Sequence, residues 1–303
     1  MNERPATAIV FSCDEGYVFL ARGLVLSLAA AGYPNGEFKL VLVDLGCGPE
    51  SLAWMKDRGV EVVPLDPALI PQKIMAVITP TQRAMAMRPW LSELLPQFEH
   101  LIWLDCDTWL QNGDVIHCLR AGANAMPDAV TVAPGNSHYG MTFYTDIEHT
   151  LAMQRGWYSN CCEPAFAKQI AATLHYSGGV WGLRRSSPFW AHWRREIEHT
   201  YPTLAIRYPD LVHLAEQIAL NIAIFKSGLV VRLDPLYNFH CNTGGAIRLP
   251  DGRVVTNMML PPREIGVLHL ANWKFLSQQY IELKLLYRGG EYLTPAEWAK
   301  LAR

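Results

Sequence analysis

The chain has 303 residues, half of them hydrophobic and 18% charged, which is enough apolar material for one large domain or two fused lobes. Its net charge of -2 and pI near 6.5 give no electrostatic reason to expect a nucleic-acid partner. Charges interrupt the apolar stretches near the start, and the first ten residues carry an acid and a proline where a secretory signal needs basic and apolar ones. We therefore expect a soluble, cytoplasmic protein without a transmembrane segment.

The first third of the chain alternates strand and helix patterns, as the βαβ units of a mostly parallel sheet do. The predicted strands are 7–13, 38–46, 60–66 and the run 101–110. The predicted helices between them are 16–33, 50–59 and 83–98. This half has the pattern of a nucleotide-binding unit, so the sequence predicts an α/β fold.

The run Leu101–Leu110 (LIWLDCDTWL) is the most informative stretch, because Asp105 and Asp107 follow its apolar part with one residue between them. Side chains two apart in a strand point the same way, and the carboxyl edge of a parallel sheet is where such folds bind ligands. Two carboxylates there suit a Mg²⁺ or Mn²⁺ ion that carries a diphosphate. The alternative is a turn that begins with acidic residues.

The second half of the chain is less regular. Strand patterns recur at 129–135, 175–183, 228–233 and 265–271, and helical spacing at 188–201 and 214–228. The polar and aromatic stretch 136–164 is predicted to be a long loop, which in a compact domain is usually functional or mobile. Seven cysteines include no C-x-x-C pair, which disfavours a disulfide framework and a zinc cluster. Adjacent Cys161 and Cys162 are expected to be reduced thiols, with a redox pair as the alternative.

Several of these stretches occur in one order that resembles glycosyltransferase family 8. They are a strand ending before Asp14 and Tyr17, an arginine helix, the D-x-D strand, a Ser-Gly-Gly turn, an acidic-Gln helix, a Tyr-Asn strand, and a late His near a Lys. The resemblance spans roughly residues 9–275 and implies the GT-A fold, a Rossmann-like domain with a mostly parallel central sheet. We expect that domain at 1–275, with a nucleotide-binding half at about 1–125, an acceptor and donor-sugar half at 126–275, and a helical extension at 276–303.

The resemblance implies metal and nucleotide contacts. Asp105, Asp107 and His269 resemble the family's ligands for Mn²⁺ or Mg²⁺. Asp14 and Tyr17 resemble its uridine pocket, although Asp14 is equally suited to cap the helix that follows.

Two basic residues resemble the family's phosphate contacts. Arg88 resembles an arginine that contacts the donor, with a surface arginine as the alternative. Lys274 resembles a diphosphate lysine, but the surrounding signature is altered. Asn272 occupies its glycine position, the lysine follows the histidine by five residues instead of six, and Phe275 replaces its proline.

The donor sugar would lie near two further motifs. Ser177, Gly178 and Gly179 resemble a turn that lets the sugar approach the backbone, with an ordinary strand bend as the alternative. Glu216 and Gln217 resemble an Asp-Gln pair, the acid contacting sugar hydroxyls and the amide lying beside the anomeric carbon. Glutamate in place of aspartate is a departure that lengthens the arm by one methylene.

The resemblance predicts transfer of a hexose from a UDP-sugar to a glycan, lipid-linked saccharide or protein hydroxyl, with retention of configuration. An inverting enzyme needs a carboxylate base, for which Asp146, Glu148 and Glu163 are candidates. A sugar nucleotidyltransferase is an alternative, but its phosphate loop is glycine-rich and basic, whereas the segment after the first strand, SCDEGYV, is acidic. An inactive nucleotide-sugar binding module is the other alternative. Peripheral membrane contact is compatible with all three.

Overall fold

The structure is a computed structural model that describes residues 7–135, 147–243, 245–256 and 261–271. Lys274 and the predicted extension at 276–303 therefore lie outside the described residues. In the part of the chain that the structure describes, no helix is both long and apolar enough to cross a membrane.

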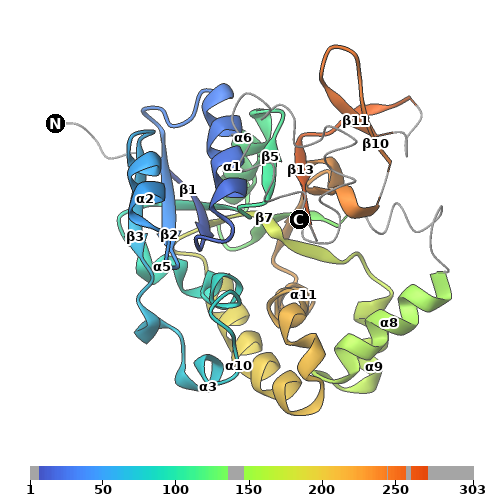
Figure 1. The fold of residues 1–303 in the computed structure, drawn as a ribbon. Helices are drawn as coiled ribbons and strands as arrows, with labels where there is room; N and C mark the ends of the chain where they lie inside the picture. Colours follow the sequence, from blue (N-terminus) through green and yellow to red (C-terminus); the bar gives the residue numbers. More distant parts are fainter. Residues whose placement is uncertain (1–6, 136–146, 244, 257–260, 272–303) are drawn as a thin grey trace.

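A seven-stranded sheet forms the centre of the molecule, in the order β3-β2-β1-β4-β7-β6-β8 (Figure 1). Its strands are β1 (Thr7–Cys13), β2 (Phe38–Asp44), β3 (Val60–Pro64), β4 (His100–Leu104), β6 (Val130–Pro134), β7 (Tyr176–Arg184) and β8 (Val230–Arg232). The strands β1 to β4 run parallel, and β7 runs antiparallel to both of its neighbours, β4 and β6. The predicted α/β class with a mostly parallel sheet is confirmed.

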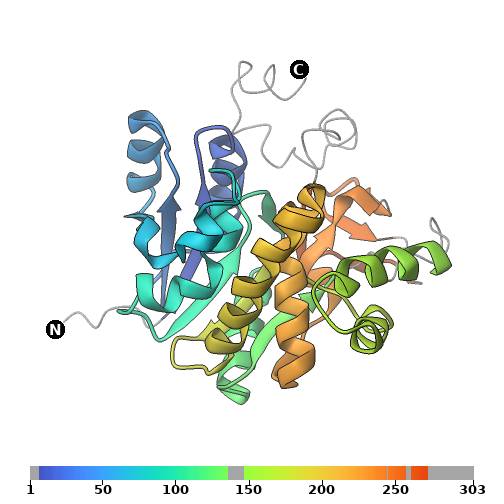
Figure 2. The ribbon, with the colours of Figure 1, turned by 90° about the horizontal axis from the view of Figure 1, so that it is seen from below.

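Both faces of this sheet are buried, because alternate side chains of each strand enter different apolar clusters. Ile9 and Phe11 of β1 pack against α1, α2 and α6, whereas Ala8 and Val10 face the cluster that includes α10 and α11. Figures 1 and 2 show α10 and α11 side by side beneath the sheet. These helices are α1 (Val18–Ala30), α2 (Pro49–Lys56), α6 (Asp114–Ala125), α10 (Phe189–Arg207) and α11 (Ala215–Ser227).

The predicted helix at 83–98 is wrong as a single element. It is a series of short turns: α4 (Arg83–Ala86), the 3₁₀ turn η2 (Arg88–Trp90) and α5 (Leu91–Leu94). Pro89 has no backbone N–H to donate and disfavours a helical conformation of the residue before it, and both effects favour a break in the helix at this point. Arg88 lies at the break and points inward, and its residue is only 4% exposed. The alternative of a surface arginine is therefore excluded.

The predicted loop at 136–164 is also wrong in part, because 147–159 forms α8 (Ile147–Ser159). The next helix, α9 (Pro164–Ala171), packs against it. Among the α8 side chains whose burial is described, only Gln154 and Tyr158 are buried, so these positions show no apolar stripe of the kind that normally marks a helix. Asp146, one of the candidate bases, lies outside the described residues.

The run 101–110 contributes to two sheets instead of one. The strand β4 ends at Leu104, residues 105–107 turn, and β5 (Thr108–Leu110) joins a second sheet in the order β5-β13-β9. In that sheet β13 (Val267–His269) pairs antiparallel with β5 and parallel with β9 (Phe239–His240). The predicted Tyr-Asn strand is wrong, because Tyr237 and Asn238 end the 3₁₀ turn η4 (Pro235–Asn238) that precedes β9.

The remaining elements are short. A third sheet contains β10 (Ala246–Arg248), β11 (Val254–Thr256) and β12 (Arg263–Glu264). The other helical turns are η1 (Pro67–Leu69), α3 (Gln72–Met75), η3 (Pro209–Leu214) and η5 (Cys241–Thr243).

Candidate active site

Two carboxylates and an imidazole meet where β4 crosses into β5. One ligand atom from each of Asp105, Asp107 and His269 lies within 4.8 Å of the others. The His269 Nε2 atom is 3.3 Å from Asp107 Oδ1 and 3.8 Å from Asp105 Oδ2. The histidine reaches the two aspartates because β13 pairs with β5, with His269 opposite Thr108. The D-x-D carboxylates share one side because the chain turns between them, not because of strand alternation.

The His269 ring is oriented by a buried amide. Its Nδ1 lies 2.8 Å from the Oδ1 of Asn238, which accepts hydrogen bonds only, so Nδ1 carries the proton and Nε2 keeps its lone pair toward the carboxylates. Burial opposes the charged forms of both His269 and Asp107. Their mutual attraction nevertheless raises the pKa of His269 and lowers that of Asp107. An imidazole nitrogen and two carboxylate oxygens suit a divalent ion such as Mn²⁺, so these residues fit the implied metal.

Asp105 is held by its other oxygen. Its Oδ1 accepts hydrogen bonds from Trp103 Nε1, at 2.7 Å, and from Arg88 Nη2. The Oδ2 is thereby left on the side of His269. Trp103 lies two residues earlier in β4 and its ring lies beneath the Arg88 guanidinium, 4.9 Å from centroid to carbon. These contacts fix the carboxylate before any ligand arrives.

Arg88 also joins the aspartate to Glu216. Its Nη1 donates to Glu216 Oε2 at 2.9 Å and to the Gly178 carbonyl at 3.0 Å. Burial disfavours the charged guanidinium, but the two carboxylates outweigh it and raise the pKa of Arg88. In this structure both terminal nitrogens of the guanidinium therefore bond to groups of the protein, whereas its Nε has no hydrogen-bond partner among the described residues. The predicted contact of Arg88 with donor phosphates stays a prediction.

Glu216 is a deeply buried acid at the start of α11. It is 2% exposed, and its Oε1 has no hydrogen-bond partner among the described residues. Burial raises the pKa of this carboxyl to about 7, and the neighbouring Arg88 limits the increase. A purely solvent-facing Glu216 is excluded by this position. Its predicted contact with sugar hydroxyls is untested.

The predicted Ser-Gly-Gly turn is part of the strand β7, and its glycines make room for the site itself. A Cβ at Gly178 would lie 2.6 Å from Arg88 Nη1 and 2.7 Å from both Glu216 oxygens. At Gly179 it would lie 2.5 Å from His269 Cε1 and 2.9 Å from Asp105 Oδ2. All of these distances are shorter than a Cβ contact allows, so a larger residue at either position would displace the side chains of the site. Ser177 donates to or accepts from His240 Nε2 at 3.1 Å.

Asp14 and Tyr17 open onto the same pocket as the D-x-D residues. This pocket, of about 160 Å³, is lined by these four residues and Arg88, together with Ser12, Cys13, Leu45, Thr81, Ala84, Met85 and Cys106. Tyr17 is the N-terminal cap of α1, and no side chain caps that helix, so the capping alternative for Asp14 is excluded. The buried Asp14 Oδ1 has no hydrogen-bond partner in the described chain, as expected of a group that receives a ligand.

Gln217 lies one residue beyond Glu216 and is half-buried. Its Nε2 is 2.6 Å from His175 Nε2, and His175 Nδ1 is 2.8 Å from the Tyr158 hydroxyl. Sequence reasoning missed His175, Tyr158, Trp103 and Asn238. Only Trp103 had a local signal, because it precedes Asp105 by two residues and shares its side of the chain.

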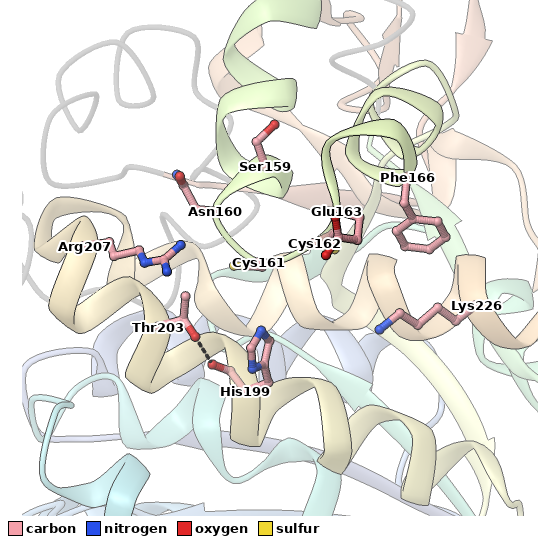
Figure 3. Close-up of a pocket in the computed structure, with 10 residues that line it drawn as sticks. All are labelled: Ser159, Asn160, Cys161, Cys162, Glu163, Phe166, His199, Thr203, Arg207 and Lys226. Atoms are coloured by element: carbon pink, nitrogen blue, oxygen red, sulfur yellow. Dashed lines mark hydrogen bonds between the residues drawn. The ribbon is translucent and has the colours of Figure 1, made fainter.

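A second pocket, of about 470 Å³, lies between α8, α9, α10 and α11 (Figure 3). Glu163, a candidate base, lines it, as do His199, Arg207 and Lys226. None of the predicted donor-binding or metal residues that the structure describes lines this pocket. The other candidate base, Glu148, is exposed on α8.

Comparisons with known proteins identify the fold. No family model matches the chain, and no curated protein is significantly similar to it in sequence. Among solved structures, the galactosyltransferase LgtC, in complex with donor and acceptor sugar analogs, matches with a TM-score of 0.59 at 16% identity, over 97% of this chain and 99% of the other. Mouse xyloside xylosyltransferase 1 matches with a TM-score of 0.51 at 16% identity, over 88% and 97%.

The bifunctional glycosyltransferase WbbM matches with a TM-score of 0.57 at 12% identity, over 98% of this chain and 51% of the other. All three neighbours are glycosyltransferases, and the likeness at these identities concerns the fold. It confirms the predicted architecture. The chain has the fold of the GT-A glycosyltransferases.

Proposed function

We propose that this protein is a metal-dependent glycosyltransferase that transfers a hexose from a UDP-sugar to a hydroxyl group of a glycan, lipid-linked saccharide or protein. The observation that carries the proposal is the cluster of Asp105, Asp107 and His269 beside the pocket of Asp14 and Tyr17. A nucleotide-sugar donor needs a metal site for its diphosphate and a second site for its nucleobase, close enough for one donor molecule to occupy both. Residues suited to each site line this pocket. The neighbours of the same fold support this class of reaction.

Different residues of the site would bind different parts of the donor. Asp105, Asp107 and His269 would hold Mn²⁺ or Mg²⁺, and the bound ion would offset the negative charge of the leaving diphosphate. The Tyr17 ring would stack on the uracil, and the Asp14 carboxylate would accept its N–H hydrogen bond. Lys274 would add a cation to the diphosphate. Arg88 would hold Asp105 and Glu216 in place, and its positive charge would help to offset the negative charge of the diphosphate.

The sugar would lie near Gly178, Gly179, Glu216 and Gln217. Glu216 would orient its hydroxyls, and Gln217 would lie beside the anomeric carbon. An amide is a weak nucleophile, so we propose front-face substitution with retention, in which the acceptor hydroxyl passes its proton to the departing phosphate. The free thiols of the described cysteines fit a reducing compartment, and we therefore place the reaction in the cytoplasm.

A thermal-shift series tests the donor assignment directly. With Mn²⁺ present, UDP should raise the melting temperature more than ADP, GDP or CMP at the same concentration, because a ligand that binds the folded protein more tightly stabilises it more. The Asp14→Ala variant should lose this preference for UDP while it still responds to Mn²⁺ alone. Equal shifts with all four nucleotides would rule out the uridine assignment.

A further inference from the structure

A chain of hydrogen bonds connects α8 to the predicted sugar site. Tyr158 of α8 contacts Nδ1 of His175, at 2.8 Å, and Nε2 of His175 contacts Nε2 of Gln217 on α11, at 2.6 Å. His175 precedes β7 and is 7% exposed, and its ring packs against Trp157 with 5.8 Å between centroids. Three separate elements thus meet at one buried imidazole, and none of these contacts serves the Asp105 and His269 cluster.

The chemistry of the two side chains sets the direction of these bonds. The amide nitrogen of Gln217 can only donate, so Nε2 of His175 accepts, and the proton of the neutral ring lies on Nδ1, facing the tyrosine oxygen. Because the amino end of Gln217 is directed at the histidine, its carbonyl oxygen occupies the other branch of the amide. The histidine therefore determines which end of Gln217 is available to a ligand.

The backbone of Gln217 is fixed separately. Asn221, one helical turn later, donates from Nδ2 to the carbonyls of Gln217 and Tyr176, and its Oδ1 accepts from the Tyr176 N–H. The two hydrogen bonds between Asn221 and the backbone of Tyr176 hold the start of α11 against β7. Asn221 leaves the Gln217 side chain free to rotate, and restraining a glutamine side chain costs up to about 2 kcal/mol of rotamer entropy. Among the described residues, the contact with His175 is the one side-chain hydrogen bond that restrains the Gln217 amide.

We propose that His175, held by Tyr158, is a positioning residue that orients the Gln217 amide in the donor-sugar site. The inference rests on the proposed glycosyl transfer, since it assigns His175 a role in that reaction and not in nucleotide binding. A side chain that is oriented in advance contributes to the rate, and a displacement of about 1 Å in such a group can cost about 100-fold. A purely structural His175 would affect stability and leave the turnover of the folded enzyme unchanged.

Turnover kinetics of four variants separate these roles. His175→Phe should lower kcat by about 10- to 100-fold with unchanged affinity for UDP and Mn²⁺. His175→Gln should restore most of kcat, because its side-chain carbonyl can accept the bond that Nε2 accepts now. Tyr158→Phe should have a smaller effect in the same direction. His199→Ala, which removes an exposed histidine at the second pocket, is the matched control and should retain wild-type kinetics.

A double-mutant cycle shows whether His175 acts through Gln217. In a Gln217→Ala background, His175→Phe should cause no further loss of kcat, since its target is already absent. Independent, multiplicative losses would overturn the proposal, and so would wild-type kcat in a folded His175→Phe protein.

The positioning role can also be judged without turnover. If the wild-type protein transfers no sugar from any donor, the proposed function fails, and crystal structures of wild type and His175→Phe then decide the inference alone. The Gln217 side chain should leave its wild-type rotamer in the variant. An unchanged, equally ordered Gln217 would refute the positioning role whatever the reaction is.

Discussion

The buried Glu216 predicts a pH-dependent stability that its amide analogue should lack. Burial raises the pKa of this carboxyl from its ordinary 4.5 to about 7, so the folded protein binds the proton more tightly than the unfolded chain does. The stability is therefore greatest below the unfolded pKa, falls as the pH rises from 4.5 toward 7, and is constant above that. Each unit of difference between the folded and unfolded pKa corresponds to about 1.4 kcal/mol, so the free energy of unfolding falls by about 3 kcal/mol in total.

The Glu216→Gln variant keeps the shape of the side chain and a carbonyl that can accept from Arg88, but it removes the titration. We expect its free energy of unfolding, relative to wild type, to increase by about 3 kcal/mol between about pH 4 and about pH 8. Urea denaturation in EDTA at a series of pH values measures this difference, and EDTA keeps metal binding out of the comparison.

Glu50→Gln, which removes an exposed carboxylate in the first turn of α2, is the control for the general effect of deleting an acid. It should follow the wild-type profile. If the Glu216→Gln and wild-type profiles run parallel across the whole pH range, burial does not raise the pKa of Glu216 and our reasoning about this group is wrong.

Three further substitutions test the construction of the site. Gly179→Ala places a Cβ 2.5 Å from His269 Cε1, so it should abolish Mn²⁺ binding in calorimetry and lower the free energy of unfolding by about 1–3 kcal/mol. Gly36→Ala, with open space around its Cβ, should do neither. Asn238→Ala should lower the affinity for Mn²⁺ by about 10- to 100-fold, because the His269 Nδ1 loses its hydrogen-bond partner. Unchanged affinity would refute the role of Asn238 in orienting His269. Trp103→Phe, which removes one donor to Asp105, should lower Mn²⁺ affinity measurably without unfolding the protein, and an unaltered titration would argue against it.

The sequence was sufficient for the parts of the fold that have a local signal. The apolar runs predicted the seven strands of the main sheet to within a few residues. The D-x-D spacing predicted a carboxylate pair at the sheet edge, but the reason was wrong, because the pair lies in a turn between β4 and β5 and not within one strand. The histidine partner came from the family resemblance, because nothing in the periodicity of residues 265–271 indicates that β13 lies beside β5.

The contacts that orient the site depend on distant pairings and had no such signal. Asn238 reaches His269 only because β9 and β13 are neighbours, and His175 reaches Gln217 only because β7 packs against α11. The inward position of Arg88 likewise follows from the helix break at Pro89, which the helical spacing of residues 83–98 conceals. A local pattern cannot distinguish an arginine on a helix surface from one that a turn directs into the core.

The central claim is that this site cleaves a nucleotide sugar with the help of a metal held by Asp105, Asp107 and His269. The direct test incubates the purified protein with a panel of UDP-, GDP- and ADP-sugars and measures release of the nucleoside diphosphate. We predict release from a UDP-sugar with Mn²⁺, none in EDTA, and none from an Asp107→Asn variant that retains the wild-type melting temperature in EDTA. Equal release in Mn²⁺ and EDTA, or full activity of Asp107→Asn, would contradict the account.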